Sequence, residues 1–146
     1  MKIDHIAIYV HDLERTKTYY EKYFGAISNN QYHNPKTGLK TYFLTFDNGS
    51  RIEIMHKPNL PEISIDGEHL GYIHLVFSVG SYEEVNCLTD ILRNDGYKIF
   101  SEPRITGDGY YESCVSDSYV FNPSSCIASV SPTCLTTAIP SSIHFF

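Results

Sequence analysis

The sequence predicts an α+β fold of two βαβββ modules, which form a curved mixed sheet around a cup with the helices on the outside. First, strand-like and helix-like patterns follow the same order in both halves of the chain. Second, "YIHLVFSV" aligns with "IDHIAIYV", and His74 with His5, which indicates an internal duplication. Third, alternation within these stretches places the aliphatic residues on one face. We expect that face to lie under the helices.

The first module is expected over residues 1–57. A β-branched run predicts a strand over 3–10. Asp12 is typical of a helix N-cap and Gly25 of a helix end, with aromatic residues at helical spacing between them. A further strand is expected near 27–33. "LKTYFLTF", "DNG" and "SRIEIM" together are typical of a β-hairpin.

The second module is expected over 72–120, after a linker at 58–71 that contains two prolines. "YIHLVFSV" predicts a strand over 72–79, and a capping box from Ser81 to Glu84 begins a helix. "YKIF" and "YYESCVSD", with the turn "GDG" between them, predict two more strands. Residues 121–146 are expected to be a divergent Ser/Cys-rich tail on a single domain.

Composition and charge exclude several classes of protein. The 146-residue chain has a net charge of −6 and no basic run, which argues against a nucleic-acid-binding surface. No apolar run approaches the roughly 18 residues of a membrane span. The opening "MKIDH" does not resemble a signal peptide. We therefore expect a cytoplasmic protein.

Two histidines and one carboxylate are the candidate metal ligands. His5 and His74 occupy matched positions and point away from the aliphatic face, and Glu53 alternates with Ile52 and Ile54 in a strand expected beside them. A single such residue is more often structural, but the duplication favours a ligand set on the concave side. Two imidazoles and a carboxylate suit Zn, Ni, Co, Mn or Fe(II).

The stretches "DHIAIYVHDLERTKTYYEKYFG", "NGSRIEIM" and "TGDGYYES" resemble the vicinal oxygen chelate superfamily, which includes glyoxalase I. The resemblance implies a divalent metal (Zn, Ni, Co or Mn) held by His5, Glu53 and His74, and a homodimer. It also implies a substrate with vicinal oxygens, such as a glutathione hemithioacetal, with Glu53 as the expected catalytic carboxylate. The candidate substrate-binding residues after the GDG turn are Tyr110, Tyr111 and Glu112, with a packed aromatic as the alternative for either tyrosine.

The chain departs from the family pattern in its last strand. The family's fourth ligand is a Glu in that strand, but "SYVFNPSSCIAS" contains no carboxylate, and Asp117 is the only acid after Glu112. Three explanations stay open. The tail is a frame-shifted or alternative end, or "CIASVS" at 126–131 is a divergent last strand that brings Cys126 near the metal, or the tail is disordered or crystal-packed.

Three functions follow from these expectations. The first is a metal-dependent lyase or isomerase similar to lactoylglutathione lyase. The second is a non-catalytic small-molecule binding protein of the same fold, like the bleomycin resistance proteins. The third is an Fe(II) oxygenase, which takes its carboxylate from the last strand and is therefore the least supported. Both histidines are present, and this favours the enzyme over the binding protein.

Overall fold

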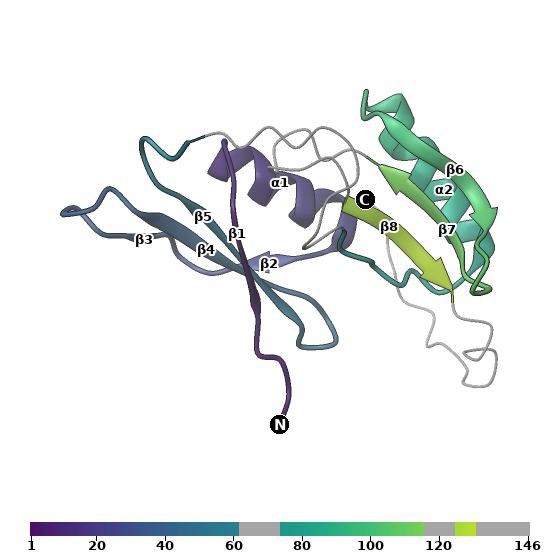
Figure 1. Ribbon diagram of the computed structural model, residues 1–146, viewed down its shortest axis with the longest axis horizontal. Helices are drawn as coiled ribbons and strands as arrows, with labels where there is room; N and C mark the ends of the chain where they lie inside the picture. Colours follow the sequence, from purple (N-terminus) through teal and green to yellow (C-terminus); the bar gives the residue numbers. More distant parts are fainter. Residues whose placement is uncertain (62–73, 116–124, 131–146) are drawn as a thin grey trace. The chain divides into compact units, whose positions relative to one another are not determined.

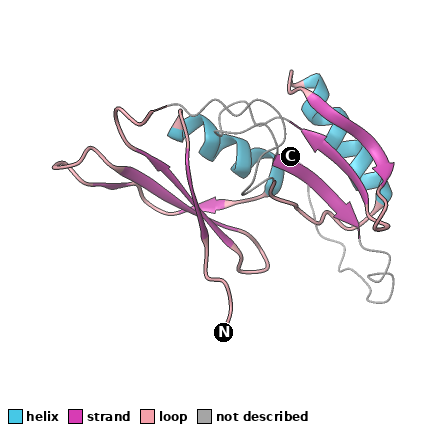
Figure 2. Ribbon diagram, in the orientation of Figure 1, coloured by secondary structure: helices cyan, strands magenta, loops and turns pink. Residues whose placement is uncertain are grey.

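The computed structural model describes residues 1–61, 74–115 and 125–130, the last of these as backbone only (Figure 1). The chain divides into two compact units, one containing Met1–Leu75 and the other Val76–Val115 with most of the last strand. Each unit combines one helix with a sheet (Figure 2). The predicted α+β class is confirmed. No helix among the described residues is long and apolar enough to cross a bilayer.

The first unit contains a five-stranded sheet and one helix. Strand β1 pairs in parallel with β5, whereas β4 pairs in antiparallel fashion with β5, β2 and β3. The elements are β1 (Ile6–Tyr9), α1 (Leu13–Phe24), β2 (Ile27–Ser28), β3 (Tyr32–His33), β4 (Lys40–Thr45) and β5 (Arg51–His56). This order matches the predicted βαβββ pattern, with the strand expected near 27–33 split into two short pairings.

Helix α1 has the predicted ends and packs on one face of the sheet. The Asp12 side chain accepts a hydrogen bond from the backbone N–H of Arg15, and Gly25 ends the helix in the left-handed region at φ 63°. The helix contacts β4 and β5. The core residues that these elements bury are Leu13, Thr16, Tyr19, Tyr20, Tyr42, Leu44, Ile52 and Ile54.

The second unit consists of a helix and a three-stranded sheet in the order β6-β7-β8. The capping box predicted at Ser81 and Glu84 is present at the start of the helix. A buried hydroxyl pair, Thr89 on the helix and Ser113 on β7, lies between helix and sheet with 2.6 Å between the two oxygens. The elements are α2 (Tyr82–Asn94), β6 (Ile99–Ile105), β7 (Tyr111–Val115) and β8 (Ser125–Val130).

The prediction of a strand over 72–79 is wrong for residues 74–79, the part that the structure describes. Between residues 74 and 79, only Leu75 makes an isolated bridge, and the rest is not strand. In the first unit, the backbone of β1 pairs with that of β5, a strand in which apolar and polar residues alternate. The strand in the place of β5 is β8, "SCIASV", whose sequence is mostly small side chains. We attribute the missing pairing to the low β-propensity of this sequence.

The backbone of β8 agrees with one of the three explanations for the tail. Residues 125–130 form a strand beside β7, as expected of a divergent last strand. The side chain of Cys126 lies outside the described residues, so its predicted approach to a metal stays a prediction.

Candidate functional site

His5 and Glu53 lie together on the face of the first sheet that α1 leaves uncovered. The parallel register of β1 on β5 places Ala7 beside Glu53, and Ile6 and Ile8 beside the buried Ile52 and Ile54. Strand alternation therefore turns Glu53 away from the helix. Nε2 of His5 lies 3.7 Å from Oε2 of Glu53. The structure thus brings together two of the three metal ligands expected from the sequence.

Asp4 and Arg51 complete the polar part of this site. The Asp4 carboxylate accepts a hydrogen bond of 2.9 Å from Nδ1 of His5 and another from the Arg51 guanidinium. These two hydrogen bonds hold the pKa of Asp4 below its usual value, and the bond from His5 has the larger effect. Sequence reasoning missed both residues. The available signals were that Asp4 adjoins His5 and that Arg51 lies two residues before Glu53, on the same strand face.

Phe43 supplies the apolar contact within this group. It lies opposite Glu53 across β4 and β5. Its ring meets the His5 ring edge-on, with centroids 5.1 Å apart, and the Arg51 guanidinium lies 5.0 Å from the Phe43 centroid. We call Asp4, His5, Phe43, Arg51 and Glu53 the His5–Glu53 cluster.

His74 does not join this cluster. It is half-buried in the segment where the predicted strand does not form. Within the described residues, no three His, Cys, Asp or Glu side chains gather closely enough to hold a metal ion. The donor chemistry of His5 and Glu53 fits a divalent metal, but a third protein donor is not in place in the described part of the chain.

The predicted substrate contacts lie in and before β7, on different sides. The Tyr111 hydroxyl donates to Oδ1 of Asn86 on α2 at 2.8 Å, and its ring stacks on Tyr82 at 4.2 Å. Tyr111 therefore faces the helix, as the packed-aromatic alternative expects. Glu112, the next residue, points to the opposite face by strand alternation. Tyr110 lies in the turn before the strand, where Thr106 holds its backbone.

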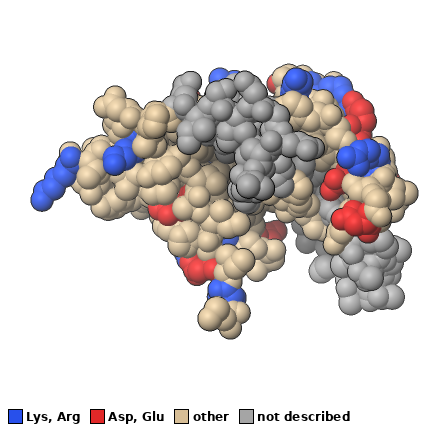
Figure 3. Space-filling view, in the orientation of Figure 1, with Lys and Arg blue, Asp and Glu red and all other residues tan. Residues whose placement is uncertain are grey.

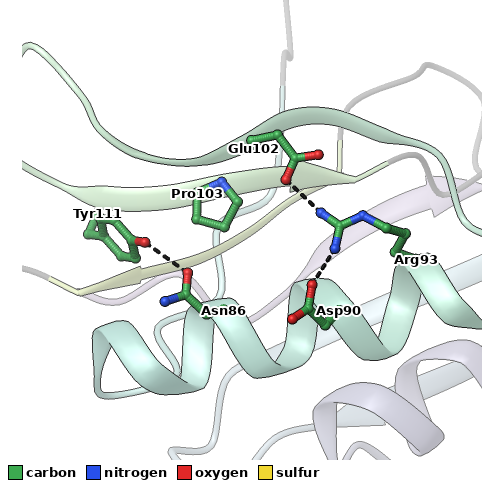
Figure 4. Close-up of a pocket in the computed structure, with 6 residues that line it drawn as sticks. All are labelled: Asn86, Asp90, Arg93, Glu102, Pro103 and Tyr111. Atoms are coloured by element: carbon green, nitrogen blue, oxygen red, sulfur yellow. Dashed lines mark hydrogen bonds and ion pairs between the residues drawn. The ribbon is translucent and has the colours of Figure 1, made fainter.

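An open polar groove lies between α2 and the strands β6 and β7, with a volume of about 520 Å³ (Figure 4). Its central cation, Arg93, is paired with both Asp90 and Glu102, the latter at 2.6 Å. Arg93 therefore offsets only one of these two carboxylate charges. The groove is on the helix side of β7, opposite Glu112. The residues lining the groove are Asn86, Asp90, Arg93, Glu102, Pro103 and Tyr111.

Charged side chains are dispersed over the molecular face in Figure 3. Lys and Arg residues do not gather into one patch among the described residues on that face.

Comparison with known proteins identifies the fold. The model of the glyoxalase/bleomycin resistance protein/dioxygenase superfamily matches residues 2–123. A glyoxalase family protein from Enterococcus faecalis is 23% identical, with a TM-score of 0.69 over 86% of this chain and 95% of that one. The trypanothione-dependent glyoxalase I of Leishmania major is 18% identical, with a TM-score of 0.67 over 88% of this chain and 86% of that one.

A third similar structure has a metal and a small molecule bound. It is the fosfomycin resistance protein FosX from Listeria monocytogenes, in complex with Mn(II) and 1S,2S-dihydroxypropylphosphonic acid. It is 18% identical, with a TM-score of 0.64 over 90% of this chain and 94% of that one. No curated protein matches the chain. At these identities, the solved structures show the fold alone.

Proposed function

Because the chain belongs to the glyoxalase/bleomycin resistance protein/dioxygenase superfamily, we propose that it is a metal-dependent enzyme of the lactoylglutathione lyase type. Its substrate is a small molecule with neighbouring oxygen atoms, such as a glutathione hemithioacetal. The observation that carries the proposal is the 3.7 Å approach of Nε2 of His5 to Oε2 of Glu53 on the helix-free face of the sheet. A glyoxalase I and a Mn(II)-containing resistance protein among the similar structures support it.

Each residue has a distinct role in this proposal. His5 and Glu53 hold a divalent metal (Zn, Ni, Co or Mn), with His74 as the third ligand. When bound, the metal polarises the substrate oxygens. The Glu53 carboxylate also moves a proton between adjacent carbon atoms, for which it is suited by its half-buried place on the sheet face that α1 leaves uncovered. Phe43 shields the His5 ring from water on one side.

The second candidate is a protein that binds a small molecule without transforming it. It is favoured by the gathering of two donor side chains, rather than three, in the described residues. Under either function, we propose that the chain forms a homodimer, because the family resemblance implies dimers. We also propose that the protein is cytoplasmic. The molar mass in solution, measured by light scattering, tests the dimer.

Metal analysis with a hemithioacetal isomerisation assay tests the proposal. His5→Ala and Glu53→Ala are expected to lower both the metal bound per chain and the turnover. His33→Ala is the matched control, because His33 is an exposed histidine on β3, and its metal content and turnover should stay at the level of the unmodified protein. Unchanged metal content in both site variants would rule out the ligand assignment. Metal binding without turnover of any hemithioacetal would favour the second candidate.

A further inference from the structure

The geometry of the His5–Glu53 cluster points to a role for Asp4 that the proposed function does not include. We infer that Asp4 is a positioning residue that fixes the His5 ring with its Nε2 lone pair toward Glu53, and that Arg51 fixes Asp4 in turn. The inference rests on the proposed function, because positioning matters only if Nε2 binds a metal.

The proton on His5 is assigned by the chemistry of its partner. An ionised carboxylate only accepts hydrogen bonds, so the 2.9 Å contact requires a proton on Nδ1 of His5. In the neutral ring, the lone pair is then on Nε2. This is the nitrogen that lies 3.7 Å from Glu53. The contact with Asp4 thus selects the tautomer that can bind a metal beside Glu53.

The orientation of the His5 ring is restricted from two directions. Asp4 holds the Nδ1 edge, and the Phe43 ring packs against the imidazole at an interplanar angle of 85°. Arg51 links the two restraints, because its guanidinium pairs with Asp4 and also lies over the Phe43 ring. A second restraint on the ring lowers the entropy lost when a metal binds.

The local backbone explains how Asp4 reaches its neighbour. Adjacent residues of a regular strand point to opposite faces. Strand β1 begins only at Ile6, so Asp4 and His5 are free of this alternation. Both side chains therefore turn to the face that carries Arg51 and Glu53. A carboxylate partner of this kind is common for metal-binding histidines, and its loss costs about 10- to 100-fold in metal affinity.

The tautomer of His5 in the metal-free protein tests the inference directly. Nitrogen-15 NMR at about pH 8.5, above the ordinary pKa of histidine, distinguishes a proton on Nδ1 from one on Nε2. The unmodified protein is expected to carry it on Nδ1. Asp4→Ala should shift the population toward Nε2, whereas Asp4→Asn keeps an acceptor oxygen and should restore much of the Nδ1 form. Arg51→Ala should produce a smaller shift in the same direction.

Zn²⁺ affinity, measured by competition with a chelating dye, is the second readout. Asp4→Ala should bind Zn²⁺ about 10- to 100-fold more weakly than the unmodified protein. Asp47→Ala is the matched control, because it removes an exposed carboxylate in the turn between β4 and β5, and its affinity should not change.

The outcomes separate this inference from the proposed function. If the unmodified protein binds none of Zn²⁺, Ni²⁺, Co²⁺ and Mn²⁺, the proposed function fails, but the tautomer of the metal-free protein still decides the role of Asp4. If the protein binds Zn²⁺ while Asp4→Ala keeps the Nδ1 form and full affinity, the positioning role is overturned and the function stands. An equal loss of affinity in Asp47→Ala would also overturn it, because net charge would then explain the effect.

Discussion

Replacing Thr89 with valine is expected to destabilise the second unit by leaving a buried hydroxyl group on β7 without a partner. Both hydroxyls of the pair have an exposed fraction of 0%. Oγ1 of Thr89 lies 2.6 Å from the backbone oxygen of Val85 and 2.6 Å from Oγ of Ser113. A hydroxyl has one proton, and Thr89 donates its proton to the carbonyl. Ser113 must therefore donate to Thr89.

The magnitudes follow from this assignment of protons. Thr89→Val keeps the shape of the side chain but leaves the Ser113 donor unsatisfied, which costs about 2 kcal/mol. Ser113→Ala removes that donor, while the proton of Thr89 still reaches Val85, so the cost is about 1 kcal/mol. In the double variant, no polar hydrogen is unpaired. Its cost should therefore be about 1 kcal/mol, well below the roughly 3 kcal/mol that additive effects would give.

Urea denaturation of the four proteins, followed by circular dichroism, measures the cycle. The free energy of unfolding should be lower for Thr89→Val than for Ser113→Ala. The double variant should lose less stability than the sum of the two single losses. Strictly additive losses, or a larger loss for Ser113→Ala than for Thr89→Val, would refute the assignment of the donor. The pair turns Ser113 toward α2, so strand alternation places Glu112, a predicted substrate-binding residue, on the opposite face of β7.

Three further predictions concern the first unit. Leu44→Ala should lower the free energy of unfolding by about 3 kcal/mol, because the Leu44 side chain is fully buried under α1. Gly25→Ala should cost about 1 kcal/mol, since φ is positive while no atom lies within 4 Å of the added Cβ. Tyr42 donates a 2.7 Å hydrogen bond to Glu14, which raises the pKa of Tyr42. The unmodified protein should therefore be more stable than Tyr42→Phe below about pH 10, and this advantage should disappear as the pH rises through the raised pKa.

Each of these predictions has a control or a contradicting result. Gly107→Ala should be nearly neutral, because Gly107 also has open space but no positive φ. A loss at Gly107 equal to that at Gly25 would contradict the backbone argument. An advantage over Tyr42→Phe that persists unchanged well above pH 10 would contradict the bond to Glu14. A loss below about 1 kcal/mol for Leu44→Ala would contradict its burial.

Much of the fold was predictable because its signals are local. The caps at Asp12, Gly25 and Ser81 depend on a few neighbouring residues, and all three are present. The hairpin of β4 and β5 follows from a short turn and an alternating pattern. The strand over 72–79 was a different kind of prediction, because its formation also needs a distant partner strand, and the sequence of β8 is a poor match for that role.

The sequence by itself determined the order of the elements, the family and the residue types that suit a metal. It also identified His5 and Glu53 as candidates, because alternation along a strand is encoded by adjacent residues. Only the tertiary structure decided which side chains meet. The registers of β1 and of β4 on β5 set Arg51 and Phe43 beside Asp4 and His5. Such contacts join residues far apart in the chain, and their geometry depends on how the strands pair rather than on any local pattern.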